Sequence, residues 1–142
     1  MIRHTRAFVL VAGLTGACQA KIAEEGQTRI DHRYTSGQVL LADPAANFFG
    51  VESRGTGQVR GNGALALTAT ELWFGQMVPD SELVIAVHDI QAVDLVSSHL
   101  GKSSGRQLVR VRYGPGDGDA VAWAVTDPDA WVKAIEQARA AK

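Results

Sequence analysis

Residues 98–106 bring together side chains that could bind an anion. Gly101, Lys102 and Ser103 follow the order that ends a phosphate-binding P-loop, but Val96 stands where that motif needs a glycine. The segment also joins two predicted strands, whereas a P-loop leads into a helix, so we exclude nucleotide hydrolysis. Cationic and hydroxyl donors could still hold an anion or a lipid headgroup, the alternative being a solvated hairpin loop. The candidate donors are His99, Lys102, Ser103, Ser104 and Arg106.

Two arginines extend this candidate site along the next strand. Arg110 and Arg112 alternate with Val109, Val111 and Tyr113, so they share one face of the predicted strand. With Arg54 or Arg60 from a glycine-rich segment, they could form a basic patch. The alternative is the ordinary solvent-facing side of an antiparallel sheet.

Residues for catalysis are not arranged in any familiar pattern. The adjacent pair His88 and Asp89 would point to opposite faces of a strand, so they form no base with its orienting carboxylate. No serine has the surroundings of a nucleophile elbow. We therefore predict a non-enzymatic protein with no catalytic residues, no metal and no cofactor. None of the four histidines is paired at a metal-ligand spacing: His4, His32, His88 and His99.

One tryptophan is expected on the outside of the sheet. Trp73 lies between Leu72 and Phe74, which are predicted to point inward, so its own side chain should point outward. An exposed tryptophan can mark a surface for a partner or a membrane interface. The alternative is that the N-terminal segment, or the turn that holds Phe48 and Phe49, covers it.

The composition sets the class of molecule. The chain has 142 residues, 46% of them hydrophobic, which is enough for one domain with a real core. Its formal net charge of −1 argues against a nucleic-acid partner, which would select a basic excess. The single cysteine excludes an intrachain disulfide.

The first 20 residues are arranged like an export or attachment signal. Arg3 and Arg6 precede an apolar run over residues 7–17, followed by Cys18. The run is shorter than the roughly 20 residues that span a bilayer as a helix. We consider a secretory signal cleaved after Ala20, a lipoprotein signal that lipidates Cys18, a short membrane anchor and a plain helix. The expected location is the membrane or the bacterial envelope, with the cytoplasm as the alternative.

The remainder is divided into a polar linker over residues 21–37 and a folded body over residues 38–142. Within the body, apolar residues recur at alternate positions in segments separated by turns, which predicts strands. A first short strand should stop at Asp43 and Pro44 or lie on an edge of the sheet there, because proline cannot donate to a sheet. The clearest hairpin joins Leu65 and Leu67 to Leu72 and Phe74. Further strands are expected around residues 83–87, 90–96, 108–113 and 121–125.

A helix should close the chain. Asp127 is a good N-cap and Pro128 occupies the first helical position. Trp131, Ile135 and Ala138 then fall on one face. The period of the apolar pattern therefore changes from two to about 3.6 at this point, which predicts a mainly β domain closed by one C-terminal helix.

This order resembles the pleckstrin-homology-like (PH-like) superfold, most closely its GRAM and bacterial branches. The resemblance implies a bent antiparallel sheet or partly open barrel of about seven strands, closed by a helix that carries a core tryptophan. The residues that carry it are Gly63–Thr68, Leu72–Phe74, Leu83–Val87 leading into Ile90, Leu108–Val111, Trp123 and Asp127–Trp131, together with Ala46–Gly50 and Val59–Gly63.

The resemblance also implies a function. PH-like domains are scaffolds that bind proteins, peptides or lipids, so we expect a binding or adaptor module that acts at a membrane. The fold alone does not assign the ligand. The alternative is a small β-barrel that carries an apolar ligand in its interior.

Overall fold

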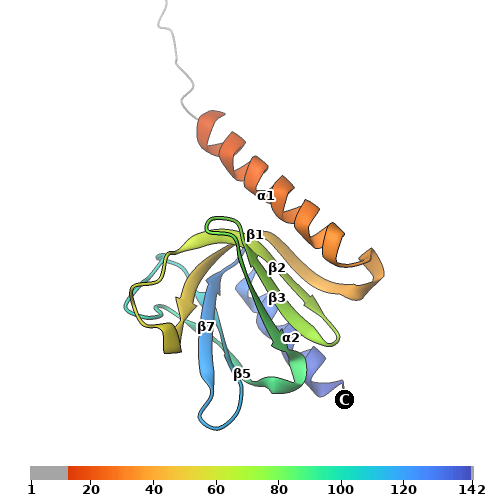
Figure 1. Ribbon diagram of the computed structural model, residues 1–142, viewed down its shortest axis with the longest axis vertical. Helices are drawn as coiled ribbons and strands as arrows, with labels where there is room; N and C mark the ends of the chain where they lie inside the picture. The colour runs from red at the N-terminus through yellow and green to blue at the C-terminus, as the bar shows by residue number, and fades with distance from the viewer. Residues whose placement is uncertain (1–12, 142) are drawn as a thin grey trace, which may run out of the picture.

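The computed structural model describes residues 13–141, and these form one antiparallel sheet with two α-helices (Figure 1). All neighbouring strands in the sheet are antiparallel. The sheet does not close, because β4 and β5 lie at its two edges. The predicted fold class, mainly β with a partly open barrel, is confirmed. The strands run in the order β4-β3-β2-β1-β7-β6-β5 and comprise β1 (Val39–Val51), β2 (Gly61–Thr68), β3 (Glu71–Gln76), β4 (Ser81–Ala86), β5 (Ile90–Val96), β6 (Leu108–Tyr113) and β7 (Asp119–Ala124).

Strand β1 joins the two halves of the sheet. Its first part pairs with β2 and its second part with β7. The strand does not stop at Asp43 and Pro44 but continues to Val51. Over residues 39–46 it pairs with β2 alone, so Pro44 lies on a local edge of the sheet, which is the other predicted alternative. The register shifts between Asp43 and Ala46, and this irregularity accommodates Pro44 within the strand. The Asp43 carboxylate accepts hydrogen bonds from Ala45 N (3.0 Å) and Thr126 N (2.8 Å), which fixes the bend.

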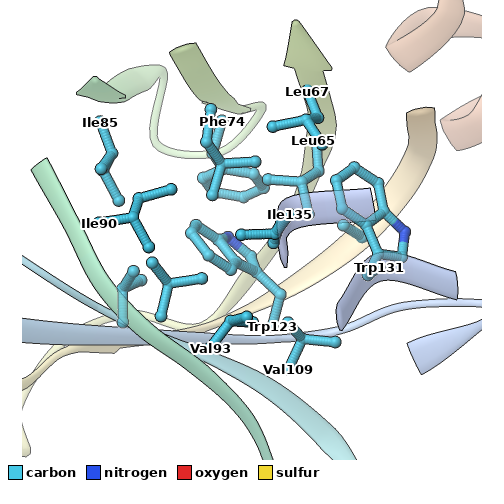
Figure 2. Packing of buried hydrophobic residues seen from close by; sticks show 14 of the residues in the cluster. Leu65, Leu67, Phe74, Ile85, Ile90, Val93, Val109, Trp123, Trp131 and Ile135 are labelled. Carbon is cyan, nitrogen blue, oxygen red and sulfur yellow. The ribbon is translucent and has the colours of Figure 1, made fainter. Parts of the chain in front are cut away.

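The core fills the concave side of the sheet. Figure 2 shows side chains from both halves of the sheet, and from the C-terminal helix, converging around Trp123. Phe74 lies between Phe48, with ring centroids 5.4 Å apart, and Trp123, at 5.8 Å. Packing of this kind stabilises the domain by removing large aromatic surfaces from water.

Helix α2 (Pro128–Ala140) closes this concave side as predicted. The Asp127 side chain accepts a hydrogen bond from Ala130 N at 3.1 Å, so the N-cap is confirmed. Trp131, Ile135 and Ala138 are buried against the sheet. At the other end, Arg139 donates to the Ile90 and Gln91 carbonyls of β5.

Helix α1 (Gly13–Arg33) replaces the predicted linker over much of its length. Its C-terminal half lies on the outer face of β1 and β2, and its N-terminal part extends past the sheet (Figure 1). Gly26 touches the backbone of Pro44, where a Cβ would come within 1.8 Å of the carbonyl oxygen. Ile30 of the same helix is buried between α1 and the sheet. Residues 21–33 of the predicted linker are therefore helical and packed on the sheet, with Gly26 and Ile30 at the contact.

Candidate ligand site

The first half of the segment between β5 and β6 forms a hydrogen-bonded turn that packs against the sheet. His99 and Lys102 form an isolated antiparallel bridge, with backbone hydrogen bonds of 2.9 and 3.0 Å. Leu100 and Gly101 make its turn with positive φ angles of 52° and 72°. The turn folds back over the outer face of the sheet, where Leu100 reaches the backbone of Gly50.

His99 and Lys102, two of the predicted anion donors, are engaged in this turn. The His99 ring is buried, and its Nε2 lies 3.0 Å from the Gly50 carbonyl, which can only accept, so this nitrogen carries the proton. Burial lowers the pKa of His99, and the hydrogen bond to Gly50 offsets part of that effect. The Lys102 ammonium donates to the Gln58 carbonyl at 3.3 Å.

The second half of the segment remains exposed. Ser103 and Ser104 hydrogen-bond within the segment, to Gly105 N and to the backbone of Arg106. Within residues 13–141, no carboxylate lies within ion-pair distance of the Arg106 side chain. The predicted donor cluster is therefore divided, with His99 and Lys102 structural and Ser103, Ser104 and Arg106 at the surface.

Ser104 and Arg106 form part of the rim of a polar hollow of about 360 Å³. Its volume falls within the range of small-molecule sites, roughly 300–1,000 Å³. The lining contains amide, hydroxyl and guanidinium groups and no carboxylate, so its one formal charge is positive. The lining residues are Gln19, Ala45, Asn47, Asn62, Ser104, Arg106, Ala124, Val125 and Thr126.

Two asparagines of the hollow are directly paired across β1 and β2. Asn47 and Asn62 are register partners, so both side chains stand on the outer face of the sheet. The Asn47 Oδ1 atom is buried and has no hydrogen-bond partner within the described residues. A buried acceptor without a donor is unfavourable, and this oxygen is too enclosed for a molecule in the hollow to reach it.

The walls of the hollow are held in place by Asp43. Its carboxylate accepts hydrogen bonds from the amides of Ala45 and Thr126, and both of these residues line the hollow. The sequence analysis did not identify Asn47, Asn62 or Thr126 as site residues. No local pattern marks them, since the hollow forms only when β1, β2, the end of β7 and the segment before β6 come together.

The predicted arginine patch is neutralised by acidic partners. Arg110 makes a bidentate contact with Asp94, at 3.1 and 2.7 Å. Arg112 lies 3.7 Å from Glu52, and Arg60 lies over the Phe49 ring at 3.9 Å. Arg110 and Arg112 do not line the hollow.

Trp73 faces outward as predicted, and of the two alternatives the structure shows the one in which the N-terminal segment covers it. Helix α1 lies over its side chain and leaves it 3% exposed. The Arg33 guanidinium lies 5.3 Å from the indole ring, and Tyr34 packs against it edge-on. The Tyr34 hydroxyl also donates a hydrogen bond to Glu71. Burial, and in second place this hydrogen bond, raises the pKa of Tyr34 to about 12, so the phenol keeps its proton.

The N-terminal part of α1 carries Cys18 and Gln19. Cys18 is exposed, and Gln19, one residue on, lines the hollow. Arg3, Arg6 and most of the apolar run of the predicted signal lie outside the described residues. Over residues 13–141, no helix is long and apolar enough to cross a membrane, and no group of three metal-ligating side chains occurs.

Comparison with known proteins supports the fold alone. No family model matches the chain, and no curated protein matches it. Among solved structures, it is similar to the C-terminal domain of an unknown protein from Leishmania infantum. The TM-score is 0.57 at 17% identity, covering 82% of this chain and 98% of that one. The PH-like assignment therefore stays a prediction.

Proposed function

We propose that the chain is a non-enzymatic PH-like binding module that is held at a membrane by its N-terminal segment and binds lipid headgroups. The observation that carries this proposal is the position of the polar hollow. Gln19 lines it, and Gln19 follows directly on Cys18 and the apolar run over residues 7–17. A helix rises about 1.5 Å per residue, so Gln19 lies roughly 3 Å beyond residue 17 along the axis of α1.

This spacing matches the dimensions of a bilayer. The headgroup layer is roughly 5–8 Å thick on each side, from a total of about 40–45 Å around a core of about 30 Å. An apolar run buried up to residue 17 puts the hollow within that layer. Lipidation at Cys18 puts it there as well, so the proposal holds for either mode of attachment.

The filled interior favours a binding module over a carrier of apolar ligands. Trp123, Phe74 and Phe48 occupy the centre of the described core. The five hollows identified on residues 13–141 lie open at the surface instead.

Fractionation of cells tests the attachment. We expect the full chain in the membrane fraction, and a chain without residues 1–20 in the soluble fraction. The intact mass of the membrane-bound form identifies cleavage or lipidation. A full chain that is soluble with Met1 intact would overturn the proposed location.

A further inference from the structure

We propose that the free edge of β4 pairs with the same edge of a second copy of this chain, so that two seven-stranded sheets join into one. The two edges of the sheet carry this proposal, because β5 is protected against a further strand and β4 is not. The pairing goes beyond the proposed membrane function and does not depend on it.

The β5 edge is protected in two ways. The Arg139 guanidinium of α2 donates to the Ile90 and Gln91 carbonyls, at 3.1 and 2.7 Å. A register shift between Ile90 and Ala92 also interrupts the regular pairing of β5 with β6. Bulges and covering elements are the usual means by which proteins keep an edge strand from pairing. A further strand is therefore hindered from adding to β5.

The β4 edge lacks these protections. Strand β4 pairs with β3 without a register shift, and it contains no lysine and no proline. Its one charged side chain, Glu82, is engaged within its own chain, because Trp73 Nε1 donates to it at 3.3 Å and the Arg33 guanidinium lies 3.7 Å away. Val84 stands on the outer face beside Trp73 and is 47% exposed. A regular edge with an exposed apolar side chain can accept another strand.

The sequence of β4 is complementary to itself in one antiparallel register. Glu82, Val84 and Ala86 stand on the outer face of the sheet. Leu83 and Ile85 face the core. A register centred on Val84 sets this residue opposite Val84 of the second copy. It also sets Leu83 opposite Ile85 and Glu82 opposite Ala86, so apolar side chains meet and no like charges do.

Other registers are less favourable. A centre at Leu83 sets the Glu82 carboxylate opposite Val84, and a centre at Ile85 pairs only the last part of each strand. A centre between two residues sets an outward side chain opposite an inward one, which a continuous sheet does not allow. The pair centred on Val84 is related by a twofold axis and uses both β4 edges, so the protected β5 edges are left outside and association stops at two copies.

Sedimentation equilibrium of the full chain in a density-matched detergent tests the pairing. We expect two copies per particle at about 100 μM, well above a dissociation constant of roughly micromolar order. Val84→Lys sets two ammonium groups opposite each other and should raise the dissociation constant by about a hundredfold. Val59→Lys, at a loop valine that is 62% exposed, is the matched control and should leave it unchanged. One copy or more than two at this concentration, or a Val84→Lys chain that pairs like the parent, would overturn the inference.

Disulfide trapping tests the register, in a Cys18→Ser background that removes the natural thiol. Cysteines at position 84 of the two copies would have Cα atoms about 4.5–5.5 Å apart, within the range that a disulfide bridges. We expect Val84→Cys to form a linked pair on oxidation, and a mixture of Glu82→Cys with Ala86→Cys to do the same.

Glu82→Cys alone is the control for chance collisions. Its two thiols would lie four residues apart along the paired strands, roughly 14 Å, so this chain should stay unlinked. Linkage of Glu82→Cys alone as fast as that of Val84→Cys would overturn the inference. Trapping needs no charged variant, so it decides the question even where Val84→Lys does not fold.

Discussion

At the scale of single residues, two buried polar side chains join segments that lie far apart in the sequence. Asp43 is 5% exposed and ties β1 to Thr126, 83 residues later in the chain. His99 is equally buried and ties the segment before β6 to Gly50. Each side chain exchanges hydrogen bonds with water for hydrogen bonds with the backbone when the chain folds. Its removal would leave the buried backbone group without a partner.

Removal of the Asp43 carboxylate should destabilise the fold. Asp43→Ala leaves two backbone N–H donors without partners, at a cost of about 2–4 kcal/mol in the free energy of unfolding. Asp117→Ala, at an exposed turn position, is the matched control and should change it by less than about 0.5 kcal/mol. Chemical denaturation measures both, and equal effects would show that the Asp43 bonds add nothing.

The depressed pKa of His99 predicts a loss of stability in mild acid. Above about pH 6.5, the ring is neutral in both the folded and unfolded chains. Below it, the unfolded chain takes up a proton first, so the free energy of unfolding falls until the pH reaches the lower pKa of the folded state. Denaturation at pH 7 and pH 5 should show this loss, and His99→Gln should reduce it. An equal loss in the variant would assign the pH dependence to other groups.

At the scale of elements, both helices pack against the sheet by different means. Helix α2 inserts Trp131 and Ile135 into the aromatic core. The residues that predict this helix lie close together in the sequence. Helix α1 is held by the close approach of Gly26 to Pro44 and by ion pairs, among them Arg29 with Asp80 at 3.1 Å. Exposed ion pairs of this kind contribute little to stability, so the packing of α1 on the sheet depends on the close fit of Gly26 against Pro44.

Truncation of the core tryptophan of α2 should be severe. Trp131 is 2% exposed, and Trp131→Ala should lower the free energy of unfolding by about 3–5 kcal/mol because it leaves a large cavity. Lys133→Ala on the exposed face of the same helix is the control, and it should stay within about 0.5 kcal/mol. A loss below about 1 kcal/mol for Trp131→Ala would contradict the packing described.

A single methyl group added at Gly26 should prevent α1 from packing against the sheet. Gly26→Ala places a Cβ where the Pro44 carbonyl oxygen lies, whereas Gly16→Ala meets nothing within 4 Å. Alanine favours helix at both positions by roughly 1 kcal/mol, so only docking distinguishes the two variants. Gly26→Ala should expose Trp73 to acrylamide quenching and α1 to proteases, while Gly16→Ala behaves like the parent. Identical quenching in all three proteins would exclude this contact.

Local signals explain why α2 and the β2–β3 hairpin could be predicted from the sequence, whereas α1 and β1 could not. Asp127, Pro128 and the apolar stripe lie within a few turns of one another. The passage of β1 through Pro44 depends instead on a bond to Thr126. The hollow combines several distant segments, and Asn47 becomes notable only because its oxygen is buried there.

At the scale of the whole molecule, the proposed attachment can be divided into its two modes. Cys18→Ser removes the exposed thiol and leaves the apolar run intact. Lipidation predicts that this variant leaves the membrane fraction. It also predicts that the mass of the parent exceeds the summed mass of the residues that the mature chain retains. A short anchor predicts no change in either quantity. Fractionation with mass spectrometry of the parent and the variant decides between them.

The unbroken course of α1 from Gly13 to Arg33 has a consequence for affinity. Under the proposed attachment, the helix holds the hollow among headgroups, so binding resembles an intramolecular step at a high effective concentration. An intrinsic dissociation constant in the millimolar range, about −4 kcal/mol, then suffices for occupancy. Such a module would look inert toward dilute soluble ligands, yet it would respond to the lipid composition around it. Weak binding in free solution is thus the expected property of this chain.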